Sequence, residues 1–111
     1  MEEKYEVTYA EQIYEDFIEA GLSKDKVQKI DDKMNFVALS PWSRTEGIEN
    51  QPIRTLRKTR FGDFRMFVDI NDLLFTMTCL AFLNRNKCYK AKDINKILTR
   101  IVSLQKSIRK D

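Results

Sequence analysis

Residues 73–83 form an almost unbroken apolar run, LLFTMTCLAFL, in a chain of 111 residues. Wound into a helix, this run is apolar on nearly every side, and such a helix has to be buried on every side. It would then lie at the centre of the fold or in an oligomer interface. A helix needs about 20 residues to cross a membrane, so the run is too short for that. We therefore predict a buried apolar helix over residues 72–84 and no membrane span.

The overall composition is typical of one packed domain, which we expect to include residues 1–111. Hydrophobic residues make up 42% of the chain, which is too many for a disordered chain. The acidic N-terminus has no apolar stretch after a basic one, and so does not resemble a signal peptide. Cys79 and Cys88 stand alone, without the spacing of a metal site or of a disulfide framework. We expect a reduced, cytoplasmic protein in which Cys79 is buried.

The acidic half of the chain, residues 1–51, is predicted to begin with two helices. Thr8 and Glu11 have the spacing of a capping box, and Gly21 fits the left-handed residue that follows a helix, which predicts a first helix over residues 9–20. Ser23 is expected to begin the second helix. The apolar positions of the two helices are Ile13, Tyr14, Phe17, Ile18, Val27, Ile30 and Met34.

A short strand and a long loop are predicted to follow the second helix. Residues 35–39 are partly β-branched and stop just before Pro41, which indicates a brief strand. Residues 40–52 contain both prolines of the chain and few apolar side chains, so they are expected to form a loop of a length that is often functional. Trp42 lies in this loop and is more typical of a core plug than of a platform for stacking on bases.

Residues 53–70 have the alternating pattern of a basic β-hairpin that reverses at Gly62. The alternation places Phe64, Met66, Val68 and Ile70 on one face of the second strand. Arg65, Phe67 and Asp69 are expected on the opposite face. One face of the hairpin is therefore predicted to be apolar and the other largely charged.

The C-terminal residues 91–110 are predicted to form one long, basic, amphipathic helix. Its apolar seam has the three-and-four spacing of a heptad pattern, at Ile94, Ile97, Ile101, Leu104 and Ile108. No glycine or proline interrupts the seam, which favours a straight helix over a helix-turn-helix. The chain is thus predicted to be α+β and mainly helical, with the hairpin in the middle. We expect a homodimer formed through the apolar helix and the C-terminal helix.

Charge is distributed unevenly along the chain. Residues 1–51 carry a formal charge of −6, residues 52–70 carry +3 and residues 84–111 carry +7. A basic surface of this kind attracts the phosphates of nucleic acid. The acidic and basic parts can instead face each other and cancel, within one chain or between two, or they can simply keep the surface solvated. Of these three interpretations, we favour nucleic-acid binding.

Residue types that support catalysis are scarce. The chain has no histidine, which excludes Ser-His and Cys-His nucleophile pairs and histidine metal sites. Glu15-Asp16 and Asp31-Asp32 are adjacent carboxylates on predicted helices, where neighbouring side chains point about 100° apart and do not converge. We interpret both pairs as solvated surface, and we expect no catalytic site, no metal and no cofactor.

The best candidate for a functional surface lies in residues 57–67, where cations alternate with aromatic side chains. Cations can hold phosphates, and an exposed Phe can stack on an unpaired base. The candidate phosphate-binding residues of the hairpin and the C-terminal helix are Arg54, Arg57, Lys58, Arg60, Arg65, Lys92, Lys96 and Arg100. We predict a non-catalytic DNA- or RNA-binding protein, a small regulator or accessory factor. The alternative is a protein-interaction module or inhibitor that docks on a larger partner protein.

Overall fold

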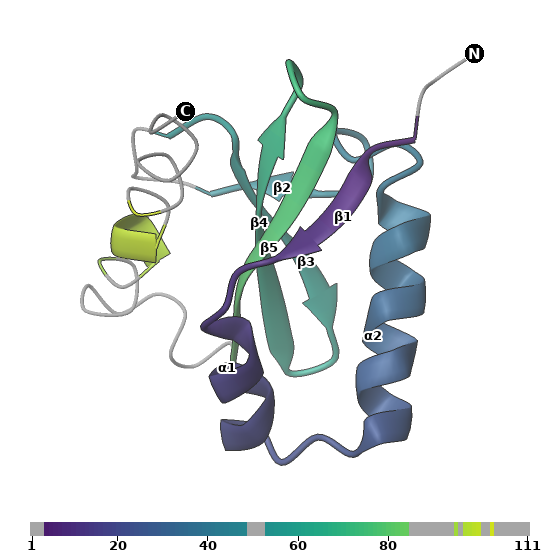
Figure 1. The fold of residues 1–111 in the computed structure, drawn as a ribbon, viewed down its shortest axis with the longest axis vertical. Helices are drawn as coiled ribbons and strands as arrows, with labels where there is room; N and C mark the ends of the chain where they lie inside the picture. The colour runs from purple at the N-terminus through teal and green to yellow at the C-terminus, as the bar shows by residue number, and fades with distance from the viewer. Residues whose placement is uncertain (1–3, 49–52, 85–94, 96, 101–102, 104–111) are drawn as a thin grey trace.

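A five-stranded mixed sheet forms the centre of the protein, with the spatial order β1-β5-β4-β3-β2 (Figure 1). The computed structural model describes residues 4–48, 53–84, 95, 97–100 and 103. The strands are β1 (Glu6–Tyr9), β2 (Glu46–Gly47), β3 (Leu56–Phe61), β4 (Phe64–Asn71) and β5 (Thr76–Asn84), and the helices are α1 (Ile13–Glu19) and α2 (Lys24–Val37). β1 is parallel to β5, and the other neighbouring strands are antiparallel.

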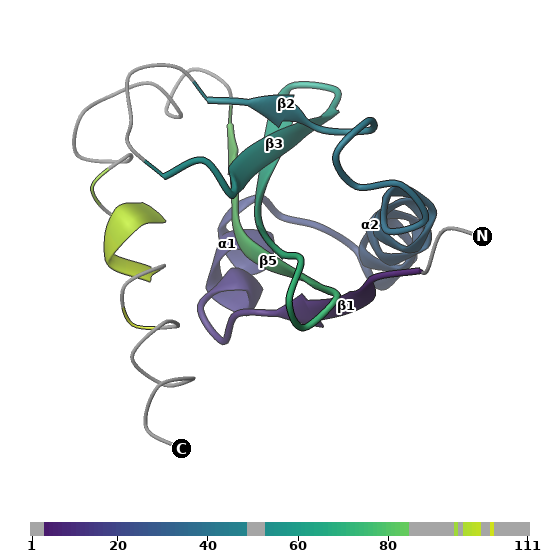
Figure 2. The ribbon, with the colours of Figure 1, turned by 90° about the horizontal axis from the view of Figure 1, so that it is seen from above.

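Apolar side chains cover both faces of the sheet. The face that packs against α1 and α2, which we call the helix face, is lined by Met66, Val68, Ile70, Met77, Cys79 and Phe82. The opposite face, which we call the open face, has a smaller apolar cluster made of Leu56, Phe67, Leu80, Ala81 and Leu83, with Ile97 of the C-terminal segment packed on it. Figure 2 shows α2 and the yellow C-terminal residues on opposite sides of the sheet. The sheet is therefore the middle layer of the structure.

The fold is not mainly helical, and the apolar helix predicted over residues 72–84 does not exist. These residues form a turn followed by the strand β5, which lies between β1 and β4. A strand that is buried on both faces is as continuously apolar as a buried helix, so periodicity alone does not separate the two. The predicted dimer interface included this helix, and residues 76–84 are instead a strand inside the sheet. The homodimer itself stays a prediction.

In the N-terminal half, the predicted start of the second helix is confirmed, whereas the first helix begins later than predicted. The Ser23 side chain caps α2 by accepting a hydrogen bond from the Lys26 backbone N–H. The first helix begins at Ile13, because Thr8 lies in β1 and its hydroxyl is hydrogen-bonded to that of Thr78, 2.7 Å away. The strand predicted over residues 35–39 is wrong, since α2 continues to Val37.

The β-hairpin of β3 and β4 is confirmed. The chain reverses at Gly62, whose φ of +58° is in the left-handed region. The predicted faces are also confirmed, because Met66, Val68 and Ile70 lie in the helix-face core. The loop predicted over residues 40–52 contains the two-residue strand β2, and residues 49–52 lie outside the described residues.

Most of the C-terminal helix predicted over residues 91–110 lies outside the described residues. Residues 97–100 are helical, and Ile97, one of the five seam residues, is buried on the open face. Among the described helices, none is long and apolar enough to span a membrane.

The left-handed turn at Gly62 predicts a difference between two glycine variants. Gly62→Ala should lower the free energy of unfolding by about 1 kcal/mol, because a left-handed backbone disfavours a side chain, although no atom lies within 4 Å of the added Cβ. Gly47→Ala is the matched control: its φ is not in that region, and the nearest atom to the added Cβ is 3.6 Å away. Urea denaturation of both variants measures the difference, and equal losses of stability would contradict the role of the turn.

Candidate nucleic-acid interface

Three of the predicted phosphate-binding residues share one end of the open face. Arg60 on β3 is the register partner of Arg65 on β4, and Lys58 lies two residues before Arg60 on the same face of β3. Arg65 is in turn opposite Leu83 of β5, a member of the open-face apolar cluster. Side chains directly opposite on neighbouring strands are about 5 Å apart at Cβ. The hairpin therefore gathers three cations, which we call the basic cluster, beside its own turn.

The backbone around the basic cluster is held by hydrogen bonds from long cationic side chains. The Arg65 guanidinium donates to the carbonyl oxygens of Gly62 at 2.9 Å and of Phe64 at 2.8 Å. Lys33 of α2 donates to the Arg60 carbonyl oxygen and lies 4.3 Å from the centre of the Phe61 ring. Arg65 is largely buried, whereas Arg60 is exposed. Arg60 is thus the cation that is most accessible, on a backbone fixed by its neighbours.

Arg57 points to the other side of β3 and contacts the loop between α2 and β2. Its guanidinium donates to the Thr45 hydroxyl and to the Thr45 carbonyl oxygen, each at 2.7 Å. It also lies 5.0 Å from the centre of the Trp42 ring. Trp42 is 38% exposed, and its indole N–H donates to Asp72 at 2.8 Å, so it is not the core plug that we predicted. The structure does not place Arg57 in the basic cluster.

The remaining predicted residues are spread over the molecule. Arg54 is exposed in the turn before β3. Lys92 and Lys96 lie outside the described residues. Arg100 is buried, and its guanidinium pairs with the Asp16 carboxylate of α1 at 2.7 Å and donates to the Leu80 carbonyl oxygen at 2.8 Å. The Asp16 carboxylate also accepts a hydrogen bond from the Phe82 backbone N–H.

Asp16 corrects our interpretation of the two carboxylate pairs as solvated surface. Glu15 is exposed, but Asp16 is only 2% exposed. Asp16 shares the buried face of α1 with the apolar residues Ile13 and Phe17. This helical spacing of three and four residues could have indicated from the sequence that Asp16 is buried. Asp31 also has a part-buried partner, since the Tyr9 hydroxyl donates to it at 2.5 Å.

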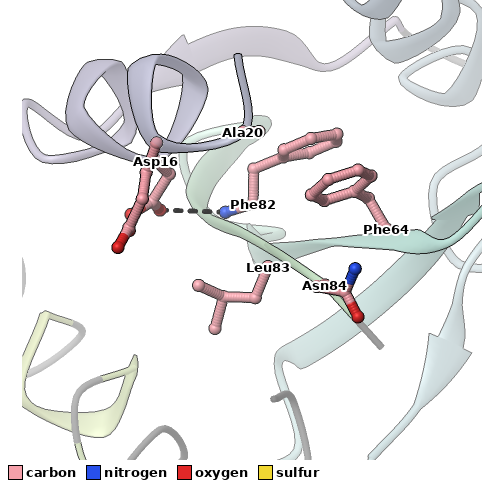
Figure 3. Close-up of a pocket in the computed structure, with 7 residues that line it drawn as sticks. Asp16, Ala20, Phe64, Phe82, Leu83 and Asn84 are labelled. Atoms are coloured by element: carbon pink, nitrogen blue, oxygen red, sulfur yellow. Dashed lines mark hydrogen bonds between the residues drawn. The ribbon is translucent and has the colours of Figure 1, made fainter. Parts of the chain in front are cut away.

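A cavity of about 220 Å³, which we call the β5-end pocket, lies at the same end of the sheet as the basic cluster but on the helix face, under α1. Its lining residues come from α1, the start of β4 and the end of β5, and they are Asp16, Glu19, Ala20, Phe64, Phe82, Leu83 and Asn84. Figure 3 shows the Phe64 and Phe82 rings together, with Leu83 and Asn84 continuing along β5. The two rings are stacked, with centroids 4.8 Å apart. We did not predict this pocket, because residues 72–84 were interpreted as a helix.

The other ionisable groups of the described residues form no metal site. No group of three His, Cys, Asp or Glu side chains there has the geometry to hold a metal ion. Cys79 is fully buried, as predicted, and this burial raises the pKa of its thiol. Burial also raises the pKa of Asp69 on the open face, and the hydrogen bond from the Thr55 hydroxyl partly offsets this effect.

Comparison with solved structures finds the same fold in a bacterial toxin and in a chain of a toxin–antitoxin complex. The Escherichia coli toxin RelE, in a free-state mutant with two arginines replaced by alanine, superposes with a TM-score of 0.66 at 14% identity, covering 89% of this chain and 99% of that one. A chain of the toxin–antitoxin complex RelBE2 from Mycobacterium tuberculosis gives a TM-score of 0.62 at 16% identity, covering 74% and 92%. Comparison of the sequence with family models and with curated proteins gives no match. The chain therefore has the RelE fold.

This fold overturns our prediction of a non-catalytic DNA- or RNA-binding regulator or accessory factor. The structures that share the fold are a toxin and a toxin–antitoxin complex. The prediction relied on a basic hairpin acting together with a basic C-terminal helix. In the structure the hairpin cations Lys58, Arg60 and Arg65 stand together, while Arg100 is paired with Asp16 in the interior.

The buried ion pair predicts a large loss of stability on removal of Arg100. Arg100→Leu should lower the free energy of unfolding by about 3 kcal/mol or more, because it leaves the Asp16 carboxylate buried without its counter-charge. Arg54→Leu removes the same charge from an exposed position and should change stability by less than about 0.5 kcal/mol. Chemical denaturation of the two variants tests this, and a stable Arg100→Leu protein would show that the pair is not formed in solution.

The raised pKa of Asp69 predicts a pH-dependent gain in stability for Asp69→Asn. A carboxyl whose pKa is higher in the folded state resists ionisation there, so its charge destabilises the fold at neutral pH. Asp69→Asn should therefore be more stable than the parent protein at pH 7, and this gain should vanish on acidification below the ordinary carboxyl pKa near 3.8. Thermal denaturation across this pH range measures it, with the exposed Asp63→Asn as control. A gain that persists in acid would have another cause.

Proposed function

We propose that this protein is a toxin of the RelE type: an enzyme that cleaves RNA on the open face of its sheet, in the cytoplasm, and that a partner protein inhibits. The observation that carries the proposal is the basic cluster of Lys58, Arg60 and Arg65 on this fold. Three cations at one end of a sheet can hold a phosphodiester between them. The overall fold supports the assignment to a toxin, and the basic cluster supports RNA as its substrate.

The chemistry of RNA cleavage suits a site built from cations. The 2′-hydroxyl of the ribose loses its proton and attacks the adjacent phosphorus, a new P–O2′ bond forms, and the P–O5′ bond breaks as the leaving oxygen takes up a proton. Negative charge accumulates on the non-bridging oxygens in the transition state. Arginine and lysine side chains that are already in place stabilise this charge without reorganisation. The Arg65 guanidinium is held in place by its hydrogen bonds to the turn carbonyls, and Lys33 holds the backbone of Arg60 by donating to its carbonyl oxygen.

An inhibitory protein partner is the second part of the proposal. A chain of similar fold occurs in a toxin–antitoxin complex, which supports a protein partner for this chain. Our alternative prediction, a module that docks on another protein, is compatible with this role. A partner that blocks the enzyme has to cover the basic cluster, and acidic side chains on its binding segment would match the charge there.

The proposal is tested by expressing the chain in bacterial cells and mapping new RNA 5′ ends after induction. Cells supply both free and ribosome-bound RNA, so the assay does not presuppose the form of the substrate. Induction should arrest growth and produce new RNA ends. Arg60→Gln should reduce the rate of cleavage by about 100-fold, since removal of one donor that stabilises transition-state charge typically has this effect.

Lys29→Gln is the matched control for the Arg60 variant. Lys29 is exposed on α2, and its replacement removes one positive charge while the basic cluster is unchanged, so cleavage should continue at the parental rate. A non-catalytic protein would instead produce no new RNA ends after induction. If soluble protein accumulates without growth arrest and without new RNA ends, the proposed function is wrong.

A further inference from the structure

A second cavity, which we call the interhelix pocket, lies between α1 and α2 on the helix face of the sheet. Its volume is about 210 Å³, and its lining residues come from the end of β1 and from the two helices: they are Tyr9, Tyr14, Phe17, Val27, Gln28 and Asp31. Figure 1 shows the short connection that joins the two helices. The sheet separates this pocket from the open face, where the basic cluster lies, so phosphate binding does not explain it.

Three aromatic rings line the interhelix pocket. The Tyr14 and Phe17 rings stand almost at right angles to each other, with an interplanar angle of 85° and centroids 6.5 Å apart. Phe17 is buried in the helix-face core and closes the pocket on that side, whereas Tyr14 is exposed and borders solvent. The faces of aromatic rings carry partial negative charge and attract cations. The pocket therefore suits a cation that lies against a ring face.

The polar groups of the interhelix pocket are mainly acceptors of hydrogen bonds. The Tyr9 hydroxyl donates to one oxygen of the Asp31 carboxylate at 2.5 Å, and burial raises the pKa of Tyr9, so this phenol stays protonated at neutral pH. The Gln28 side-chain amide donates to Asp32 at 3.0 Å, which leaves its carbonyl oxygen as an acceptor. No described lysine or arginine forms an ion pair with Asp31. Asp31 is thus a carboxylate in a ring-lined pocket without a positive partner from the described residues.

An exposed apolar ridge on α1 borders the interhelix pocket. Tyr14 and Ile18 are four residues apart, so their side chains are neighbours on the surface of the helix. They are 59% and 79% exposed. Contiguous exposed apolar side chains beside a pocket are typical of a protein interaction site, whereas a free cation would leave them exposed. The pocket and the ridge together fit a protein segment that carries a cation next to an apolar residue.

From these observations we propose that the interhelix pocket binds one arginine side chain of the inhibitory partner protein, with an apolar residue of the same segment covering Ile18. This inference rests on the proposed function, which supplies the partner, and adds a contact on the helix face. A guanidinium is planar, stacks on aromatic rings, is weakly hydrated, and carries five N–H donors and no acceptor. It therefore matches an aromatic pocket whose polar groups are acceptors. A lysine ammonium is compact and strongly hydrated, so it should bind less tightly.

The arginine contact assists inhibition although it lies away from the basic cluster. A segment held in the interhelix pocket keeps the rest of the partner close to the protein, so that another segment of the same chain binds the basic cluster in an intramolecular step. The two contacts require opposite charges on the partner, basic at the interhelix pocket and acidic at the basic cluster.

The test is an NMR titration of the full chain with N-acetyl-arginine amide, N-acetyl-lysine amide and N-acetyl-citrulline amide. Citrulline has the shape of arginine without its charge, so it isolates the effect of the cation. The arginine probe should shift the backbone signals of Val27 and Gln28 and the ring signals of Tyr14, with an affinity at least about tenfold higher than that of the citrulline probe. The lysine probe should bind more weakly than the arginine probe at the same site. This measurement does not require RNA cleavage.

Two pairs of variants separate the interhelix pocket from a general effect of charge. Asp31→Asn should reduce the affinity for the arginine probe about tenfold, because it removes the charge but keeps an oxygen that accepts from Tyr9. Glu15→Gln makes an equal charge change at an exposed position outside the pocket and should bind like the parent protein. Tyr14→Leu should weaken arginine binding about fivefold, because it removes a ring, whereas Tyr14→Phe keeps the ring and should bind normally.

Each remaining outcome also decides the proposal. Pocket signals that do not move with the arginine probe, or that move equally with the citrulline probe, would overturn it, and the proposed function would stand if RNA is cleaved in cells. Tighter binding of putrescine, a diamine without a peptide backbone, than of the arginine probe would also overturn it and assign the pocket to a free polyamine. Binding of the arginine probe without any cleavage of RNA in cells would support the arginine site and contradict the proposed function.

Discussion

The buried Asp16 carboxylate links three parts of the chain that are distant in sequence. It accepts from the backbone N–H of Phe82 on β5 and from Arg100 in the C-terminal segment, and Arg100 also donates to the Leu80 carbonyl oxygen. β1 pairs with β5 only as far as Cys79, so no strand among the described residues pairs with the later part of β5 on that side. Backbone groups at such an edge need other partners when they are buried. Asp16 and Arg100 supply them, and this allows β5 to continue past the end of β1.

The extension of β5 creates the candidate site. Because β5 reaches Asn84, Leu83 lies opposite Arg65 and Asn84 lies opposite Phe64. The basic cluster thereby gains an apolar neighbour on one side of the sheet, and the β5-end pocket is formed on the other side under α1. A shorter β5 would leave the hairpin of β3 and β4 without a neighbour near its turn. The ion pair thus stabilises the end of the sheet where we place RNA binding, although it lies outside the basic cluster itself.

The sequence predicted the parts of the fold that local patterns determine. Alternation along residues 53–70 predicted the hairpin and its two faces. The same alternation places Lys58 and Arg60 on one face of β3 and Arg57 on the other. Ser23 predicted the start of α2. The failure at residues 72–84 has a physical cause, because helices on one face and the C-terminal segment on the other bury β5 completely. A strand buried on both faces lacks the alternation by which strands are recognised.

The site could be predicted only in part, because its charge depends on tertiary contacts. In the sequence, Arg100 and Asp16 belong to opposing basic and acidic blocks, and such blocks can either cancel each other or face solvent. Arg100 and Asp16 cancel each other in the interior, whereas Arg60 stays exposed on the hairpin. One molecule therefore contains both an arginine whose charge is cancelled by a carboxylate and an arginine whose charge faces solvent. Formal charge along a sequence counts both arginines equally, although only a cation that remains accessible after folding can attract RNA.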